Sequence, residues 1–178
     1  LAEVGTSQLV QRYLAIGRLD VVIAHVTSTL RAGASLETRQ RKRLATLLAL
    51  CLLHVAVESS PPGVRDVSVL TTEETTFLEM ASADTDYDMD TIVRAALSVG
   101  AVYLALRVAH VRDAIDQCVD LIVGKHASLS SGEPWSSPIS LLPLSMEELR
   151  FIAKHSSLTL EIVEPIASVS DQLRIIVA

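Results

Sequence analysis

The chain has 178 residues, a formal net charge of −6 and a sequence pI of about 5.3. Its length fits one domain, or one domain with a small appendage, and allows a real core, and its acidic balance excludes a protein whose whole surface binds nucleic acid. Hydrophobic residues make up 49% of the sequence and the mean hydropathy is +0.40, so we expect part of the apolar surface to face a partner.

Aromatic residues account for only 3% of the chain, so Ala, Val, Leu and Ile must supply the core. This composition favours helix-on-helix packing over aromatic-rich strands. We predict an all-α fold of antiparallel helical hairpins: a helical bundle over residues 1–124, a Pro/Ser-rich loop over 125–143, and a C-terminal part over 144–178. The sequence begins with Leu1 rather than Met, so we expect a processed chain or an excerpt.

Residues 7–30 have helical apolar spacing with Gly17 in the middle, which fits two short helices turning at 17–20 or one bent helix. The stretch LVQRYLAIGRLDVVIAHVTSTL resembles a single tetratricopeptide hairpin, and so a helical-repeat scaffold with right-handed packing. Six positions carry the resemblance: Leu9, Tyr13, Gly17, Asp20, Ile23 and Leu30. Four positions depart from the motif: Thr6, Val22, Thr29 and Ala34. No second copy is legible at the period of about 34 residues.

A third helix is predicted from a Ser35 cap to about Glu58, where SSPPG ends it. It contains an uncharged apolar run, Leu44 to Val57, of 14 residues. A membrane span needs about 20, so this run predicts a central, surrounded core helix. The basic RQRKR in front of the run keeps contact with a membrane surface open as an alternative.

Four cations lie near the start of this helix: Arg39, Arg41, Lys42 and Arg43. The helix dipole disfavours positive charge there, so something anionic is expected to meet them, and Glu37 offsets them in part. Arg39 and Arg43 share one face. The cluster is either a solvated helix face or a contact for an acidic protein, an RNA backbone or an anionic lipid. It has no interleaved aromatic residues, so it offers no platform for base stacking.

The segment DTDYDMD, Asp84 to Asp90, comes after a short helix that the capping box at Thr71 and Glu74 should open. Alternating carboxylates can indicate a calcium loop, which also needs Gly at its turn and an acid at its twelfth position. Those positions hold Met89 and Ala95. We therefore favour a helix start over a metal site, with Asp88 or Asp90 as the cap and the other carboxylates near the positive end of the helix.

Apolar residues then recur in steps of four and three, which predicts one helix from about Asp90 to Val123. The stripe is formed by Leu97, Ala101, Leu104, Val108, Val111, Ile115, Cys118 and Ile122. Asp113, Asp116 and Asp120 on another face are expected to form a solvated acidic stripe. In the next loop, Trp135 is expected to tether the loop to the body or to anchor a partner.

Leu144 to Leu149 is a complete helix start, with Ser145 as the cap, Glu148 reaching back, and Leu144 packing on Leu149. The helix should end near His155, and residues 158–178 fit either a helix or a β element. The stretch SMEELRFIAKHSSLTLEIVEPI resembles the winged-helix end of PCI-domain scaffolds. That resemblance implies a subunit of a multiprotein complex.

Nothing in the sequence indicates a catalytic, cofactor or metal site. Cys51 and Cys118 lie in apolar helical patterns and are interpreted as buried small hydrophobes rather than a disulfide. The five histidines are scattered, and no zinc, phosphate-loop or nucleophile-elbow motif is present.

We therefore expect a non-catalytic scaffold or adaptor subunit whose partners are other proteins. The alternatives are a binder of RNA or acidic lipid that acts through residues 39–43, with nucleic acid the less favoured partner, and an enzyme whose site is assembled from scattered residues. No signal-type run is recognised, and an intracellular location is favoured.

Overall fold

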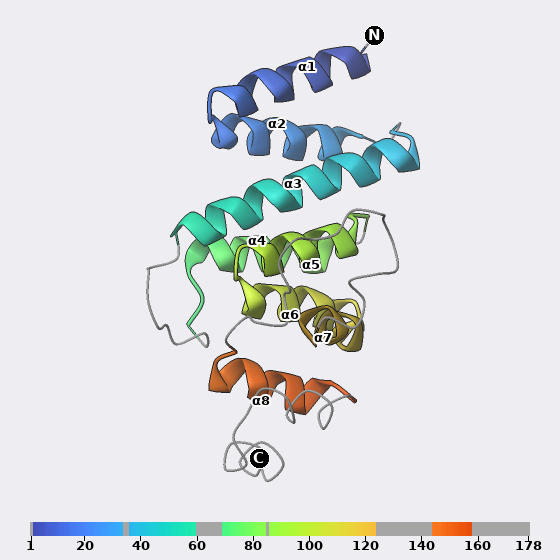
Figure 1. Ribbon diagram of the computed structural model, residues 1–178. Helices are drawn as coiled ribbons and strands as arrows, with labels where there is room; N and C mark the ends of the chain where they lie inside the picture. Colours follow the sequence, from blue (N-terminus) through green and yellow to red (C-terminus); the bar gives the residue numbers. More distant parts are fainter. Residues whose placement is uncertain (1, 34–35, 60–68, 85, 124–143, 158–178) are drawn as a thin grey trace. The chain divides into compact units, whose positions relative to one another are not determined.

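The computed structural model describes residues 2–33, 36–59, 69–84, 86–123 and 144–157. Within these residues the fold is all-α, as predicted, and no strand is present (Figure 1). The helices are α1 (Ala2–Ala15), α2 (Leu19–Ala32), α3 (Thr38–Ser59), α4 (Thr72–Ala83), α5 (Met89–Ser98), α6 (Val102–Val111), α7 (Ile115–Val123) and α8 (Met146–His155). The predicted Ser35 cap, Trp135 and the ambiguous residues 158–178 lie outside the described residues.

The chain divides into two compact units. The first unit holds α1 to α4, and each helix in it packs on the next helix in sequence. In the second unit α5 packs on α6 and α6 on α7, and α8 contacts both α6 and α7. Packing between sequence neighbours is what helical hairpins predict. In the described part of the chain, no helix is long and apolar enough to cross a membrane.

Three of the links between helices are the same kind of turn, a Schellman motif. Each ends a helix with a residue in the left-handed conformation: Gly17 (φ 71°), Gly100 (φ 77°) and Asp113 (φ 52°). In the first turn the N–H of Arg18 donates to the carbonyl of Tyr13 and the N–H of Gly17 to that of Leu14. The bonds at Gly100 and Asp113 have the same pattern. Because these links are only three residues long, the helices that they join stay close together, and each joined pair is in contact.

The prediction of one helix from Asp90 to Val123 is wrong. The chain forms α5, α6 and α7 instead, with breaks at Gly100 and at Asp113. The apolar spacing continues through both breaks, because each turn returns the next helix to the same core. Most of the predicted stripe is therefore buried, although Val111, next to the second break, is 44% exposed. The two-helix alternative for residues 7–30 is confirmed, with the turn at Gly17.

The predicted capping boxes are both present. The Thr71 and Ser145 hydroxyls accept the N–H of Glu74 and Glu148, and each glutamate accepts the N–H of its cap residue in return. Leu144 packs against Leu149, as expected. These reciprocal bonds satisfy backbone donors that a helix start otherwise leaves unpaired, which fixes where α4 and α8 begin.

The core of the first unit centres on α3, where Ala45, Ala49 and Ala56 are fully buried. Small side chains on α3 permit close helix packing, and α3 contacts both α2, where Val22 and Val26 are buried, and α4, where Phe77 is buried. The expectation that the apolar half of α3 is surrounded holds only in part. Leu47 and Leu50 are intermediate in exposure, so the described part of the first unit leaves one side of α3 partly exposed.

Both cysteines are buried free thiols, in agreement with the sequence interpretation. Cys51 is 4% exposed and Cys118 is 1% exposed. Burial raises the pKa of Cys51, and it raises the pKa of Cys118 to about 12. The two thiols therefore stay protonated near neutral pH and act as apolar packing groups.

The left-handed turn at Asp113 generates a stability prediction. Asp113→Gly should raise the free energy of unfolding by about 0.5–1 kcal/mol, because glycine adopts positive φ without a steric penalty. The matched change Gly100→Ala should lower it by about 1 kcal/mol through backbone strain alone, since no atom lies within 4 Å of the added Cβ. Urea unfolding followed by circular dichroism measures both changes. A lower urea midpoint for Asp113→Gly would contradict the assignment of this turn.

Candidate functional site

The basic cluster lies in the first two turns of α3. Successive helix residues are about 100° apart, so Arg39 and Arg43 share one face, whereas Arg41 lies on another side of the helix. Arg39, Lys42 and Arg43 line one pocket, described below, while Arg41 is directed to a separate carboxylate. The four cations therefore face at least two different environments.

The acidic segment 84–88 meets this cluster within the first unit. The guanidinium of Arg41 donates from Nε to the carboxylate of Asp86, 45 residues away. The Lys42 Nζ lies 3.5 Å from Asp88 Oδ1. The side chains of these two pairs are all between 39% and 55% exposed, so each pair contributes at most about 1 kcal/mol. The pairs thus match charge and position the segment more than they stabilise the fold.

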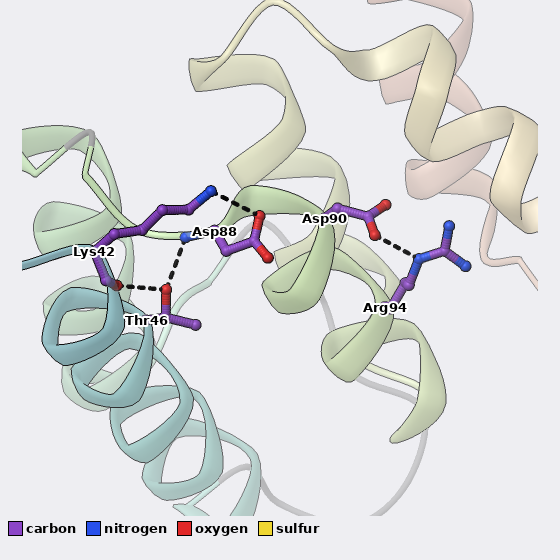
Figure 2. Close-up of polar contacts among 5 residues, drawn as sticks. All are labelled: Lys42, Thr46, Asp88, Asp90 and Arg94. Carbon is purple, nitrogen blue, oxygen red and sulfur yellow. Dashed lines mark hydrogen bonds and ion pairs between the residues drawn. The ribbon is translucent and has the colours of Figure 1, made fainter. Parts of the chain in front are cut away.

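A hydroxyl fastens the end of the same segment to α3. The Thr46 Oγ1 accepts the N–H of Asp88 at 2.8 Å and donates to the carbonyl of Lys42 at 2.8 Å (Figure 2). Next to it, Tyr87 is 2% exposed and donates its hydroxyl to the carbonyl of Ala81 at 3.1 Å. The alternation of the sequence therefore has a structural meaning, because Tyr87 points into the core while Asp86 and Asp88 point at cations.

Of the other two carboxylates, Asp84 accepts the N–H of Asp86 at 2.9 Å, while Asp90 belongs to the second unit and lies in the first turn of α5. The Asp90 carboxylate accepts a hydrogen bond of 2.8 Å from Nε of Arg94, which lies one turn further along the same helix (Figure 2). Asp88 directly precedes α5, and Asp90 lies close to the positive end of its dipole, as predicted for a helix start. Among the described residues, no group of three or more His, Cys, Asp or Glu side chains could hold a metal ion.

Pairing leaves two cations of the cluster uncompensated. Arg39 and Arg43 have no acidic partner within the described residues, and Glu37 forms no ion pair there with either of them. Both arginines line a solvent-open pocket of about 410 Å³ in the first unit, which we call the α3 pocket. Its lining consists of Arg39, Lys42, Arg43, Thr46, Leu47, Leu50 and Asp88. One end of the pocket is therefore cationic and the other aliphatic.

A second polar cluster lies in the second unit, where α8 ends against the start of α7. Asp116 accepts the hydroxyls of Ser156 and Ser157, both at 2.6 Å, and the N–H of Ser157 at 3.0 Å. Hydrogen bonds from the side chains of Ser156 and Ser157 lower the pKa of Asp116, and the bond from Ser156 has the largest effect. The cluster therefore links the start of α7 to the residues that follow α8. The expectation that Asp116 is merely solvated is wrong.

Aromatic and imidazole rings join α6 to α8 next to this cluster. The His110 and His155 ring centroids are 4.3 Å apart, and the Phe151 ring lies 5.8 Å from that of Tyr103 and 5.7 Å from that of His110. Arg107 lies over both the Tyr103 and Phe151 rings. Desolvation lowers the pKa of His155, and the charges of His110, Lys154 and Arg107 lower it further. The neutral imidazole is thus the form that fits the helix contact.

No protein-family model matches the chain, and no curated protein or solved structure matches it either. The tetratricopeptide and PCI resemblances therefore stay sequence-based hypotheses.

The residues of the basic cluster are recognisable in the sequence, but the way they divide between partners is not. Arg41 and Lys42 are engaged by the acidic segment, whereas Arg39 and Arg43 are left in the α3 pocket together with Leu47 and Leu50. The sequence contains one basic run, residues 39–43, and one acidic run, residues 84–90, and opposite charges of this kind indicate that the two runs could pair. Their pairing depends on the α3–α4 packing, which local patterns do not specify.

The hydrogen bonds that the Thr46 hydroxyl forms with the backbone of Lys42 and Asp88 can be tested by substitution. Thr46→Val removes the acceptor for the Asp88 N–H and should lower the free energy of unfolding by about 1–2 kcal/mol, because a partly buried donor loses its partner. Thr46→Ser keeps the hydroxyl and should restore most of that loss. Urea unfolding measures both variants. Equal stability of the Val and Ser variants would show that the Thr46 hydroxyl contributes nothing to the free energy of unfolding.

The rings between α6 and α8 predict a pH dependence. The pKa of His155 is lower in the folded chain than the ordinary value of 6.5, so the unfolded chain takes up the proton first as the pH falls. The free energy of unfolding should therefore decrease as the pH falls below about 6.5, and the decrease should continue until the pH is below the pKa of His155 in the folded chain. Above about pH 6.5 this group should not affect stability. Urea midpoints measured from pH 8 to pH 5 should show the decrease, and His155→Asn should reduce it. An unchanged pH profile in that variant would contradict the assignment.

Proposed function

We propose that this chain is a non-catalytic scaffold or adaptor that acts through protein–protein contacts. The observation that supports the proposal is the α3 pocket, in which two uncompensated guanidiniums adjoin half-buried leucines on a helix held by α2 and α4. Arginine beside aliphatic side chains is the kind of surface that partner proteins use, since it combines directional charge with apolar area.

The overall apolar character of the sequence lends less support than expected. Among the described residues, five large hydrophobic side chains are exposed: Leu14, Ile16, Val69, Val99 and Val111. Ile16 and Val99 directly precede the glycines of Schellman turns, and Val111 lies in the last turn of α6. Exposed aliphatic residues that are scattered singly are common on monomeric proteins. The case for a partner therefore depends on the α3 pocket and not on hydropathy.

Binding of RNA or acidic lipid through Arg39, Arg41, Lys42 and Arg43 is the second candidate. Affinity for a polyanion grows with the number of phosphates that the protein neutralises. Asp86 and Asp88 already engage two of the four cations, and the whole chain is acidic. Two free guanidiniums would give weak binding that salt easily screens. A protein partner fits this reduced charge better, and a PCI-like subunit is one form that such an adaptor could take.

Photo-crosslinking from the pocket distinguishes these functions. With p-benzoylphenylalanine in place of Leu47, irradiation in an extract of the cells that naturally make the chain should give a protease-sensitive adduct. The same amino acid in place of Ala24, an exposed position on α2, serves as the matched control and should give none.

The adduct should also disappear when Arg39→Glu and Arg43→Glu are added, because the partner would no longer dock. An adduct that is sensitive to nuclease, or that extracts with lipid, would favour the second candidate. No adduct at position 47 would contradict a protein-binding role for the α3 pocket.

A further inference from the structure

We infer that the α3 pocket recognises a helical segment of a partner protein that carries two carboxylates one turn apart, followed by aliphatic side chains. This inference rests on the proposed adaptor function and specifies the chemistry of its partner. It uses three properties of the pocket, namely the spacing of its cations, the position of its leucines and the carboxylate that it contains.

The cations set the spacing of the acidic groups. Arg39 and Arg43 are four residues apart on one helix, so their backbones are separated by about 6 Å along its axis. Two acidic residues at positions i and i+4, or i and i+3, of a partner helix have nearly the same separation. Each guanidinium can hold a carboxylate with paired hydrogen bonds. Both lack an acidic partner in the described part of the chain, so no intramolecular ion pair has to break first.

The leucines determine which side chains the partner places beyond its carboxylates. Leu47 and Leu50 line the same pocket one to two turns beyond Arg43, and both are intermediate in exposure. From position 39 to position 50 the helix extends about 16 Å, which is the length of about three turns. A partner segment of three turns therefore spans the pocket, with acidic groups at one end and aliphatic groups at the other. This asymmetry also fixes the direction in which the segment docks.

The Asp88 carboxylate disfavours a uniformly anionic ligand. It lies in the pocket lining and compensates Lys42 at 3.5 Å. A nucleic acid or a lipid surface would place phosphates against this carboxylate and charged groups against Leu47 and Leu50, and both contacts are unfavourable. A peptide with only two acidic groups at one end avoids both contacts. Charge complementarity thus points to an acidic and aliphatic protein segment.

Fluorescence anisotropy with labelled synthetic peptides tests this chemistry. The probe is a helix-forming peptide of about 14 residues with two glutamates one turn apart, followed by two leucines spaced to meet Leu47 and Leu50. It should bind the wild-type chain. Peptides with Glu→Gln or Leu→Ser changes should each bind at least about tenfold more weakly, because each loses one half of the contact. These comparisons keep the protein unchanged, so they hold even if a protein variant misfolds.

Variants of the chain locate the binding site. Arg39→Glu with Arg43→Glu should weaken binding about tenfold or more, whereas Arg12→Glu with Arg31→Glu should change it less than about twofold. The second pair makes the same charge change at exposed positions of α1 and α2. Asp88→Asn should tighten binding several-fold, because it frees Lys42 and removes the pocket carboxylate while its backbone N–H to Thr46 is kept. Circular dichroism confirms that each variant is folded.

Three results would overturn the inference: equal binding of the Glu→Gln peptide, equal weakening by both double variants, or tighter binding of poly-U RNA or phosphatidylserine vesicles than of the peptide. If the crosslink from Leu47 captures a protein and no acidic peptide binds, the adaptor function stands and the proposed partner chemistry is wrong. If neither is seen, both are wrong.

Discussion

The distribution of charge in the first unit depends on the contact between the start of α3 and the acidic segment after α4. A helix start is an unfavourable place for four positive charges, and the chain relieves this by returning Asp86 and Asp88 to Arg41 and Lys42. The ion pairs are too exposed to hold the segment alone. The buried Tyr87 and the Thr46 hydroxyl fix it in register, so that each carboxylate meets a cation. As a result, Arg39 and Arg43 are the two cations of the cluster that have no acidic partner among the described residues.

Short links impose a second constraint, because three-residue turns keep consecutive helices close together, and each pair that they join is in contact. The same Schellman geometry recurs at Gly17, Gly100 and Asp113, where a left-handed residue lets the chain reverse. Sequence neighbours therefore become spatial neighbours within each unit, and the core is assembled from local contacts. In the second unit α8 adds a contact from a more distant part of the chain, which the bonds of Asp116 and the ring cluster around Phe151 secure.

Features that are encoded locally could be predicted from the sequence. The two capping boxes, the turn at Gly17 as one of two alternatives, and the burial of both cysteines follow from residues within one or two turns of each other, while the all-α class follows from the composition. The long helix over 90–123 was a wrong prediction, because apolar spacing reports which residues face the core and not whether the backbone continues. Gly100 was a visible signal for a break, whereas Asp113 was a weaker one, because non-glycine residues seldom adopt positive φ even though aspartate does so more often than most. The sequence could not predict which cations of the basic cluster pair with the acidic segment. That pairing joins residues 45 apart in the chain, and it forms only because α3 packs on α4.

The state of the two thiols has a practical consequence for studying the protein in solution. Alkylating reagents attack the thiolate, and both sulfur atoms are kept protonated and shielded by the helices around them. A single cysteine engineered on the surface would consequently react with a maleimide dye or a nitroxide far faster than the wild-type positions do. Site-specific spectroscopic probes can therefore be attached at neutral pH without first replacing Cys51 and Cys118, and the packing of α3 and α7 is left as it is.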